Sequence, residues 1–179
     1  MVQRLSSKNV NGKRYLYVSY YDKGDGKYKF GRIQLGDWWP MFRHDLRHTG
    51  YSTSRAPNTN QILWSYKTVS GGTPSPAVVN DMVYVGSGDC KVYALDAATG
   101  AFIWSYTTGG SVSYSSPAVA YGRVYVGSLD NKVYALNATT GAYVWSYTTG
   151  WYVLSSPAIA DGRVYVGSQD KKVYALDAS

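Results

Sequence analysis

The stretch KVYALDAATGAFIWSY spans residues 91–106, and KVYALNATTGAYVWSY repeats it at residues 132–147. A third copy opens at Lys172 as KVYALDAS. Three further markers recur in step, namely the Trp of WSY, the Pro of SPA and the first Tyr of YVGS, at Trp64, Trp104, Trp145, Pro76, Pro117, Pro157, Tyr84, Tyr125 and Tyr165. Every interval is 40 or 41 residues, so the chain contains an internal repeat.

One period of the repeat predicts four short strands, at residues 76–79, 82–87, 91–97 and 101–108. Gly and Asp lie between these strands, where tight turns need positive φ or a side chain that binds turn amides. The chain has 19 Tyr and 6 Trp but no Glu, a composition that favours strands over helices. Four antiparallel strands per period of this length are typical of a propeller blade. The predicted fold class is therefore all-β, with a partial β-propeller preceded by a β-hairpin segment.

The spacing Ala-x-Asp-x-x-x-Gly-x-x-x-Trp in the opening stretch resembles the tryptophan-docking motif of pyrroloquinoline-quinone-like propeller repeats. Its residues here are Ala94, Asp96, Gly100 and Trp104, then Ala135, Asn137 in the Asp place, Gly141 and Trp145. The resemblance covers residues 37–179, because DWWPMFRHDLRHTGYS at 37–52 also resembles the segment that precedes the first blade. It implies a propeller in which each Trp ring packs against the neighbouring blade.

The strand pattern predicts a domain organisation of three parts. Residues 1–36 form a hairpin segment, 37–60 a lead-in, and 61–179 the propeller repeats. Within the repeats we expect a lone fourth strand at 61–68, whole blades at 73–108 and 114–149, and an incomplete blade at 154–179. Propellers typically have four to eight blades. We therefore expect a piece of a larger propeller, or a chain that associates with copies of itself through open blade edges.

The positive charge is concentrated at the start of the chain. Residues 1–36 hold 8 Lys and Arg against 2 Asp, whereas residues 61–179 hold 7 of each kind. A basic, Tyr-rich hairpin can follow phosphates and stack bases, and it weakly resembles the β-sheet arms of integrases and transposases. Lys27, Lys29 and Arg32 are the candidate nucleic-acid contacts. The alternative is an exposed hairpin whose Lys residues prevent edge-to-edge aggregation.

Few residues have a pattern that indicates a catalytic or metal site. His44, Asp45 and His48 have ligand-like spacing but no evident third ligand, so we predict packing or capping instead. The serine pairs Ser115–Ser116 and Ser155–Ser156 recur at one repeat position, which favours a structural role over a nucleophile. Cys90 is the single cysteine and excludes an internal disulfide. Residues 22–26 lack the ligand count of a calcium loop.

The family resemblance implies quinone-dependent dehydrogenases as enzymatic relatives, which hold the quinone with calcium. Because the chain has no Cys pair and no Glu, the sequence predicts no cofactor and no enzyme activity. The predicted function is a scaffold or recognition module for a protein, peptide or glycan partner. The alternatives are a piece of a quinone-dependent dehydrogenase and nucleic-acid contact through the hairpin. The resemblance favours a secreted or cell-surface location, yet no signal peptide and no apolar membrane span are apparent.

Overall fold

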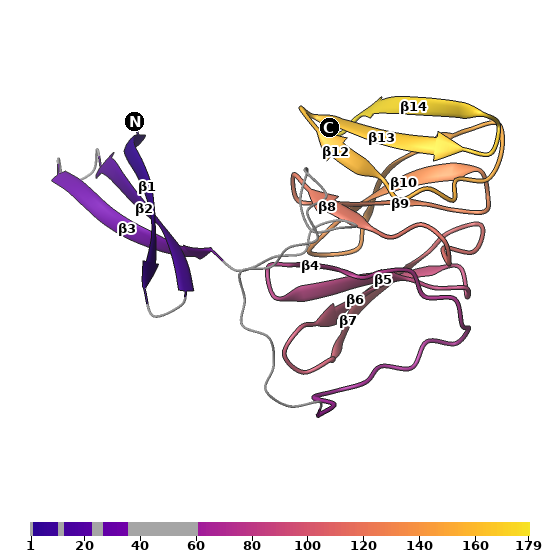
Figure 1. The fold of residues 1–179 in the computed structure, drawn as a ribbon, viewed down its shortest axis with the longest axis horizontal. Coiled ribbons are helices and arrows are strands. Elements are labelled where there is room, and N and C mark those ends of the chain that lie inside the picture. The colour runs from indigo at the N-terminus through magenta and orange to yellow at the C-terminus, as the bar shows by residue number, and fades with distance from the viewer. Residues whose placement is uncertain (1, 11–12, 23–26, 36–60) are drawn as a thin grey trace. The chain divides into compact units, whose positions relative to one another are not determined.

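The computed structural model describes residues 2–10, 13–22, 27–35 and 61–179 (Figure 1). The strands in these ranges belong to two compact units, and each unit is described by itself. None of the described residues is helical, so none belongs to a helix that could cross a bilayer. The predicted all-β class is confirmed.

The N-terminal unit is an antiparallel sheet of three strands in the order β1-β2-β3, with bounds β1 (Val2–Val10), β2 (Lys13–Asp22) and β3 (Lys27–Leu35). The predicted hairpin corresponds to β2 and β3, whose register places Tyr17 opposite Arg32. Strand β1 was not predicted. Its residues VQRLSSKNV do not alternate between apolar and polar types, so its pairing with β2 depends on the neighbouring strand rather than on local pattern.

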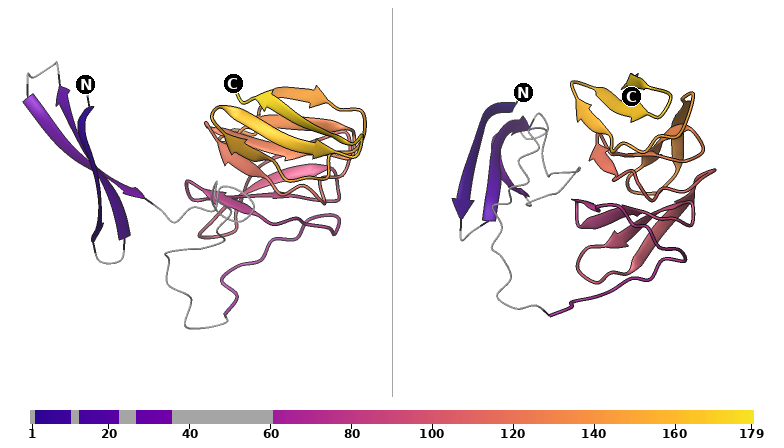
Figure 2. Two further views of the ribbon diagram at one scale, coloured as in Figure 1. Left: turned by 45° about the horizontal axis from the view of Figure 1, so that its top comes forward. Right: turned by 45° about the vertical axis from the view of Figure 1, so that its right-hand side comes forward.

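The second unit contains three successive antiparallel sheets, which are the blades (Figures 1 and 2). The first blade has the order β4-β5-β6-β7, with bounds β4 (Ala77–Val79), β5 (Met82–Gly86), β6 (Lys91–Asp96) and β7 (Phe102–Thr107). The second has β8 (Ala118–Ala120), β9 (Arg123–Gly127), β10 (Lys132–Asn137) and β11 (Tyr143–Thr148). The third has β12 (Ala158–Ala160), β13 (Arg163–Ser168) and β14 (Lys172–Asp177). The predicted partial propeller is confirmed.

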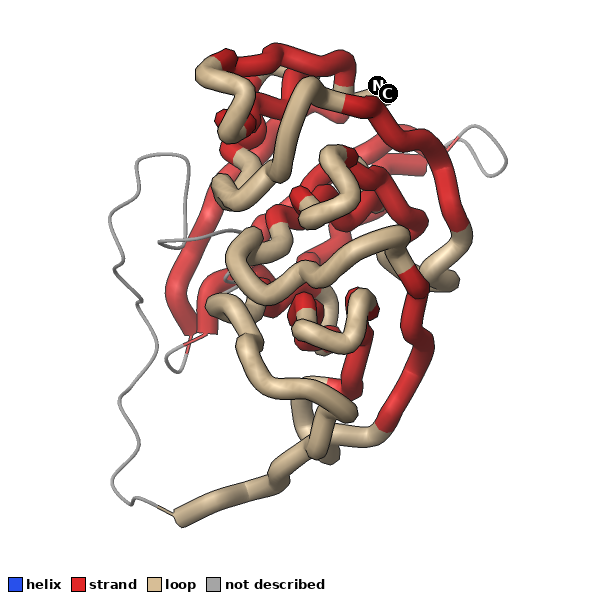
Figure 3. Tube along the Cα trace, turned by 90° about the vertical axis from the view of Figure 1, so that its right-hand side faces the viewer, coloured by secondary structure: helices blue, strands red, loops and turns tan. Residues whose placement is uncertain are grey.

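The hydrophobic core lies between the blades rather than within one of them. Adjacent blades approach through their first strands, β4 with β8 and β8 with β12, and the blades follow one another in an arc (Figure 3). Strand β9 shows how one sheet serves two interfaces. Val124 and Val126 pack with the first blade, whereas Tyr125 packs with the third, because successive side chains of a strand point to opposite faces.

Residues 61–68 differ from the strand expected there. They have no regular secondary structure, although their sequence QILWSYKT matches β7 and β11 in the residues Trp, Ser and Tyr. Within the described part of the chain no strand pairs with this segment to accept its backbone hydrogen bonds. A strand requires such a neighbour, so sequence similarity to a strand is not sufficient here.

Candidate functional site

The tryptophan of one repeat packs on the glycine of the next. Trp104 on β7 is 7% exposed and donates a hydrogen bond from Nε1 to the carbonyl oxygen of Ala138 at 3.0 Å. A Cβ on Gly141 would lie 2.6 Å from the Trp104 ring, so only glycine fits beneath it. Gly141 also has φ of 72°, which glycine adopts without strain.

The preceding repeat has the same contact. Trp64 donates from Nε1 to the carbonyl oxygen of Ala97 at 3.0 Å, and a Cβ on Gly100 would lie 2.5 Å from the Trp64 ring. Each docking contact therefore joins two repeats. Gly100 contacts Trp64 of the repeat before it, not Trp104 of its own.

The other motif residues build the turn that receives the ring. The Asp96 Oδ1 accepts hydrogen bonds from the backbone N–H groups of Ala98 and Thr99. The Asn137 Oδ1 accepts the equivalent hydrogen bonds from two backbone N–H groups at 2.9 Å each, so it preserves the backbone contacts of the aspartate. Ala94 and Ala135 are buried opposite Trp104 and Trp145 in the strand register.

Trp145, the third tryptophan of the series, has a different environment. Its ring lies 5.9 Å from that of Tyr125, as the Trp104 ring does from Tyr84, but its Nε1 is buried without a hydrogen-bond partner. The carbonyl oxygen of Ala178, which corresponds to that of Ala138, accepts from Tyr125 and, in place of the tryptophan, from Arg123. The docking contact of this tryptophan is thus incomplete.

A tyrosine–aspartate pair closes the turn before the third strand of each blade. Asp170 accepts a hydrogen bond from the Tyr174 hydroxyl at 2.5 Å and another from the backbone N–H of Gly150 at 2.9 Å. The hydrogen bond from Tyr174 holds the pKa of Asp170 below its usual value. The equivalent pairs are Tyr93 with Asp89 and Tyr134 with Asp130. Sequence reasoning missed these pairs, although an Asp two residues before each KVYAL was a visible signal.

The serines of the repeat link neighbouring blades. Ser115 Oγ donates to the carbonyl oxygen of Ser155 at 2.9 Å and accepts from the Gly127 N–H at 2.8 Å. The Ser116 N–H donates to Ser156 Oγ at 3.0 Å. These serines bind backbone groups of the adjacent blade, and none of these contacts pairs a serine with a base.

An exposed aromatic pair occupies the loop between β11 and β12. Trp151 is 54% exposed and Tyr152 is 40% exposed, and their rings meet edge to face with centroids 5.7 Å apart. The next residue, Val153, is 1% exposed and lies directly over Gly127. The loop is therefore anchored by Val153 and presents two large aromatic side chains to solvent.

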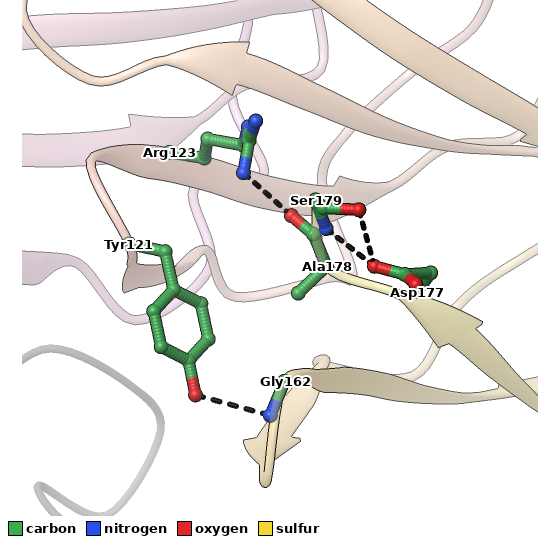
Figure 4. Close-up of a pocket in the computed structure, with 6 residues that line it drawn as sticks. All are labelled: Tyr121, Arg123, Gly162, Asp177, Ala178 and Ser179. Atoms are coloured by element: carbon green, nitrogen blue, oxygen red, sulfur yellow. Dashed lines mark hydrogen bonds between the residues drawn. The ribbon is translucent and has the colours of Figure 1, made fainter.

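A shallow pocket of about 280 Å³ lies where the second and third blades meet, near the end of β14 (Figure 4). Arg123 donates to the Ala178 carbonyl oxygen at 2.8 Å, and the Tyr121 hydroxyl accepts from the Gly162 N–H at 3.2 Å. Ser179 caps the Asp177 carboxylate, which has a lowered pKa because the Ser179 hydroxyl and N–H bind it. The polar groups of this pocket are already bound to one another.

The remaining sequence candidates fall in different places. His44, Asp45 and His48 lie outside the described residues. Among the residues that the structure describes, no group of three or more His, Cys, Asp or Glu converges. The half-buried Cys90 occupies a turn with φ of 65°. Lys27, Lys29 and Arg32 lie on β3, and their contact with nucleic acid stays a prediction.

Comparison with known proteins gives one family match. The model of the family described as outer membrane protein assembly factor BamB matches residues 53–179. The solved structure of BamB from Moraxella catarrhalis aligns with a TM-score of 0.51 and 20% identity, over 93% of this chain and 43% of that one. At that identity the structural likeness concerns the fold alone.

Quinoprotein dehydrogenases are also similar to this chain. The quinoprotein alcohol dehydrogenase PedE of Pseudomonas putida is 31% identical over 86 residues, which is 48% of this chain and 14% of that protein. The quinohemoprotein alcohol dehydrogenase of Comamonas testosteroni aligns with a TM-score of 0.65 and 28% identity, over 79% of this chain and 26% of that one. The chain thus spans only a small part of these relatives.

These relatives contradict the prediction that the chain is not an enzyme, because both are named as alcohol dehydrogenases. The fold family also implies a metal-bound quinone, and calcium takes six to eight oxygen ligands. In residues 61–179 five carboxylates bind turn amides or hydroxyls of the repeats and do not converge, namely those of Asp89, Asp96, Asp130, Asp170 and Asp177. The described residues therefore do not fit this cofactor.

Proposed function

Because the chain belongs to the family of the outer membrane protein assembly factor BamB, we propose that residues 61–179 form a propeller module that recognises a protein partner. The observation that supports the proposal is the exposed Trp151–Tyr152 pair. Tyr and Trp are enriched among the residues that dominate binding energy at protein interfaces. Large exposed aromatic side chains also lower solubility, and these two are not part of the hydrophobic core.

The aromatic pair departs from the repeat, which separates it from the structural residues. The preceding blade has Gly110 and Ser111 where this loop has Trp151 and Tyr152. A residue that the blade needs for folding recurs in each copy, as the docking Trp and the linking Ser do. Because one copy of the loop folds with a glycine and a serine at these positions, folding does not require the aromatic pair.

The backbone beneath the pair is fixed before any partner binds. The Trp151 carbonyl oxygen accepts hydrogen bonds from Thr149 Oγ1 at 2.6 Å and Ser168 Oγ at 3.0 Å. The Tyr152 carbonyl oxygen accepts from the Gln169 N–H at 2.9 Å. A pre-ordered loop loses little conformational entropy on association, and this increases the affinity available from a small surface.

The probe is an unfolded outer membrane protein, because the family is described as an outer membrane protein assembly factor. The affinity of the 179-residue chain for the fluorescently labelled probe is compared with that of the W151A/Y152A variant. Loss of both aromatics is expected to weaken binding by tenfold or more, since each such residue contributes at least about 1–2 kcal/mol at an interface. F102A is the matched control, because Phe102 on β7 is 53% exposed but lies in another blade.

The outcomes separate the alternatives. Equal affinities of the chain and of W151A/Y152A would reject the loop as the recognition site. Binding of oligosaccharides in place of the protein probe, lost in W151A/Y152A, would assign the same surface to a glycan and overturn the protein proposal.

A second candidate function is a role within a quinoprotein alcohol dehydrogenase, which the identity of 31% with PedE favours. The described residues do not supply the ligands, so this role would require other residues for the cofactor. Titration of the full chain with pyrroloquinoline quinone and calcium, followed by absorbance, tests it. A bound chromophore would support this candidate, and no uptake would reject it for this chain.

A further inference from the structure

The third blade has an open edge. Strand β14 pairs with β13 on one side, and in the described residues no strand lies on its other side. Val173 of β14 is 80% exposed, whereas the equivalent Val92 and Val133, which are covered by a fourth strand, are fully buried. An exposed strand edge has unpaired N–H and C=O groups that favour pairing with another strand.

Residues 61–68 match this open edge. They are placed like the fourth strand of a blade but pair with no strand in the described residues. Trp64 binds Ala97 of the first blade as Trp104 binds Ala138 of the second. The ring of Tyr66 lies 5.7 Å from that of Tyr93, and the ring of Tyr106 lies 6.0 Å from that of Tyr134. Residues 61–68 are therefore docked on the first blade as β7 is docked on the second.

The two parts lie at opposite ends of the arc of blades. The blades contact one another in chain order, β4 with β8 and β8 with β12, and residues 61–68 border the first blade while β14 belongs to the third (Figures 1 and 3). Ile62 and Leu63 are 84% and 89% exposed, compared with 53% and 40% for the equivalent Phe102 and Ile103 of β7. A partner for residues 61–68 and a partner for β14 are both lacking in the described part of one chain.

We propose that residues 61–68 of a second copy of this chain form the fourth strand of the third blade. The register of β6 with β7 and of β10 with β11 gives the pairing. Trp64 of the second copy lies opposite Ala175, Tyr66 opposite Val173, and Ile62 opposite Leu176. Residues 61–68 can stay docked on their own first blade during this pairing. Strand β7 does both things at once, because it pairs with β6 in its own blade and docks on the next blade.

The environment of Trp145 supports this association. A pocket of about 260 Å³ lies at the open edge and is lined by Trp145, Ser146, Tyr147, Leu176, Asp177 and Ser179. A buried indole N–H without a hydrogen-bond partner destabilises the folded state, and the Nε1 of Trp145 is in this state. A strand beside β14 would cover this pocket and hold the Asp177–Ser179 turn as the equivalent turns of the first two blades are held.

The association is head to tail, because each copy has one strand to give and one edge to receive. Such contacts close into a ring when the rotation permits and otherwise continue as a filament. Two copies provide six blades, which lies within the range of known propellers. The expected species is a dimer, and the inference is independent of the Trp151–Tyr152 proposal.

The first test is the solution mass of the full 179-residue chain, measured by sedimentation equilibrium over a dilution series. We expect the mass to rise with concentration from 19.7 kDa towards twice that value. Thr108 of β7 donates its backbone N–H to the Cys90 carbonyl oxygen, so the alternate N–H groups that face β6 include that of Tyr106. Y66P should therefore prevent this rise, since Tyr66 is the equivalent of Tyr106 and proline removes the N–H that would face β14. A mass of 19.7 kDa at every concentration would overturn the proposal.

A charge reversal tests the register without changing the fold. The proposed pairing places Lys67 opposite Lys172, and both side chains are exposed. At the equivalent positions of β6–β7 and β10–β11, a Lys lies opposite a Thr. K67D should tighten association about twofold to fivefold for each strand pair, and K67D/K172D should reverse this gain. K171D changes the net charge equally but lies outside the register. If K171D tightened association as much as K67D, net charge would explain the effect and the proposed pairing would be rejected.

Discussion

The indole ring of Trp104 covers Gly141 so closely that a Cβ on the glycine would lie 2.6 Å from the ring. The two residues belong to successive repeats, and the same relationship holds between Trp64 and Gly100. The glycine of the motif therefore has two functions, since it permits the positive φ of the turn and leaves room for the neighbouring ring.

The variant G141A separates these two functions when compared with G122A. Gly122 has φ of 69°, close to the 72° of Gly141, but a Cβ there would meet nothing within 4 Å. G122A should cost about 1–2 kcal/mol from backbone conformation alone. G141A should cost about 1–3 kcal/mol more, because the added methyl group displaces a packed ring. Urea denaturation measures both free energies of unfolding, and equal losses would show that the ring contact contributes nothing.

The carbonyl oxygen of Ala138 accepts from two side chains, Trp104 Nε1 at 3.0 Å and the Tyr84 hydroxyl at 3.2 Å. W104F should lower the free energy of unfolding by about 1–3 kcal/mol, because it removes a buried hydrogen bond. In W104F/Y84F the oxygen keeps neither donor, so the loss should exceed the sum of the two single losses. Additive losses in a double-mutant cycle would show that the two donors act independently.

Burial and the hydrogen bond to Asp89 raise the pKa of Tyr93 to about 12 from its ordinary value of 10.0. The folded state thus favours the neutral phenol. Its stabilising contribution is complete below pH 10 and is lost as pH rises through about 12. The urea midpoint should fall over this window, and the fall should be smaller in Y93F. An identical pH dependence in both proteins would contradict this assignment.

The Tyr174–Asp170 pair gives the opposite pH dependence of stability, because its contribution is lost as pH falls. The hydrogen bond from Tyr174 lowers the pKa of Asp170 below 3.8, so the folded state favours the carboxylate. Its contribution is present above the unfolded pKa and is lost as pH falls through the lower folded value. Acid titration followed by tryptophan fluorescence should show a less steep loss of stability in D170N. Y174F should bring the pKa of Asp170, measured by NMR, back towards its ordinary value.

Local features of the sequence were sufficient to predict the blades. Residues 82–87, 91–97 and 101–108 were expected as strands and correspond to β5, β6 and β7 within one residue at each end. Alternation of side chains and glycine-containing turns both act over a few residues, so they can be recognised without a structure. The repeat then extended each prediction to the next blade.

Features that depend on a neighbour in space were not predictable in this way. Residues 61–68 resemble β7 in sequence but lack a sheet beside them, and β1 forms a strand without a clear alternating pattern. The missing partner of Trp145 depends on the position of one carbonyl oxygen in the adjacent blade. The aromatic pair at Trp151 was visible in the sequence only as a departure from the repeat.

The two complete docking contacts, of Trp64 and Trp104, span a similar distance along the chain, since donor and acceptor lie 33 and 34 residues apart. Each tryptophan therefore needs the same glycine and carbonyl acceptor in the repeat that follows it. Duplication or deletion of one whole period of the gene preserves the spacing between each tryptophan and these residues. Blade number can change in evolution by unequal recombination, without compensating mutations at the new junction.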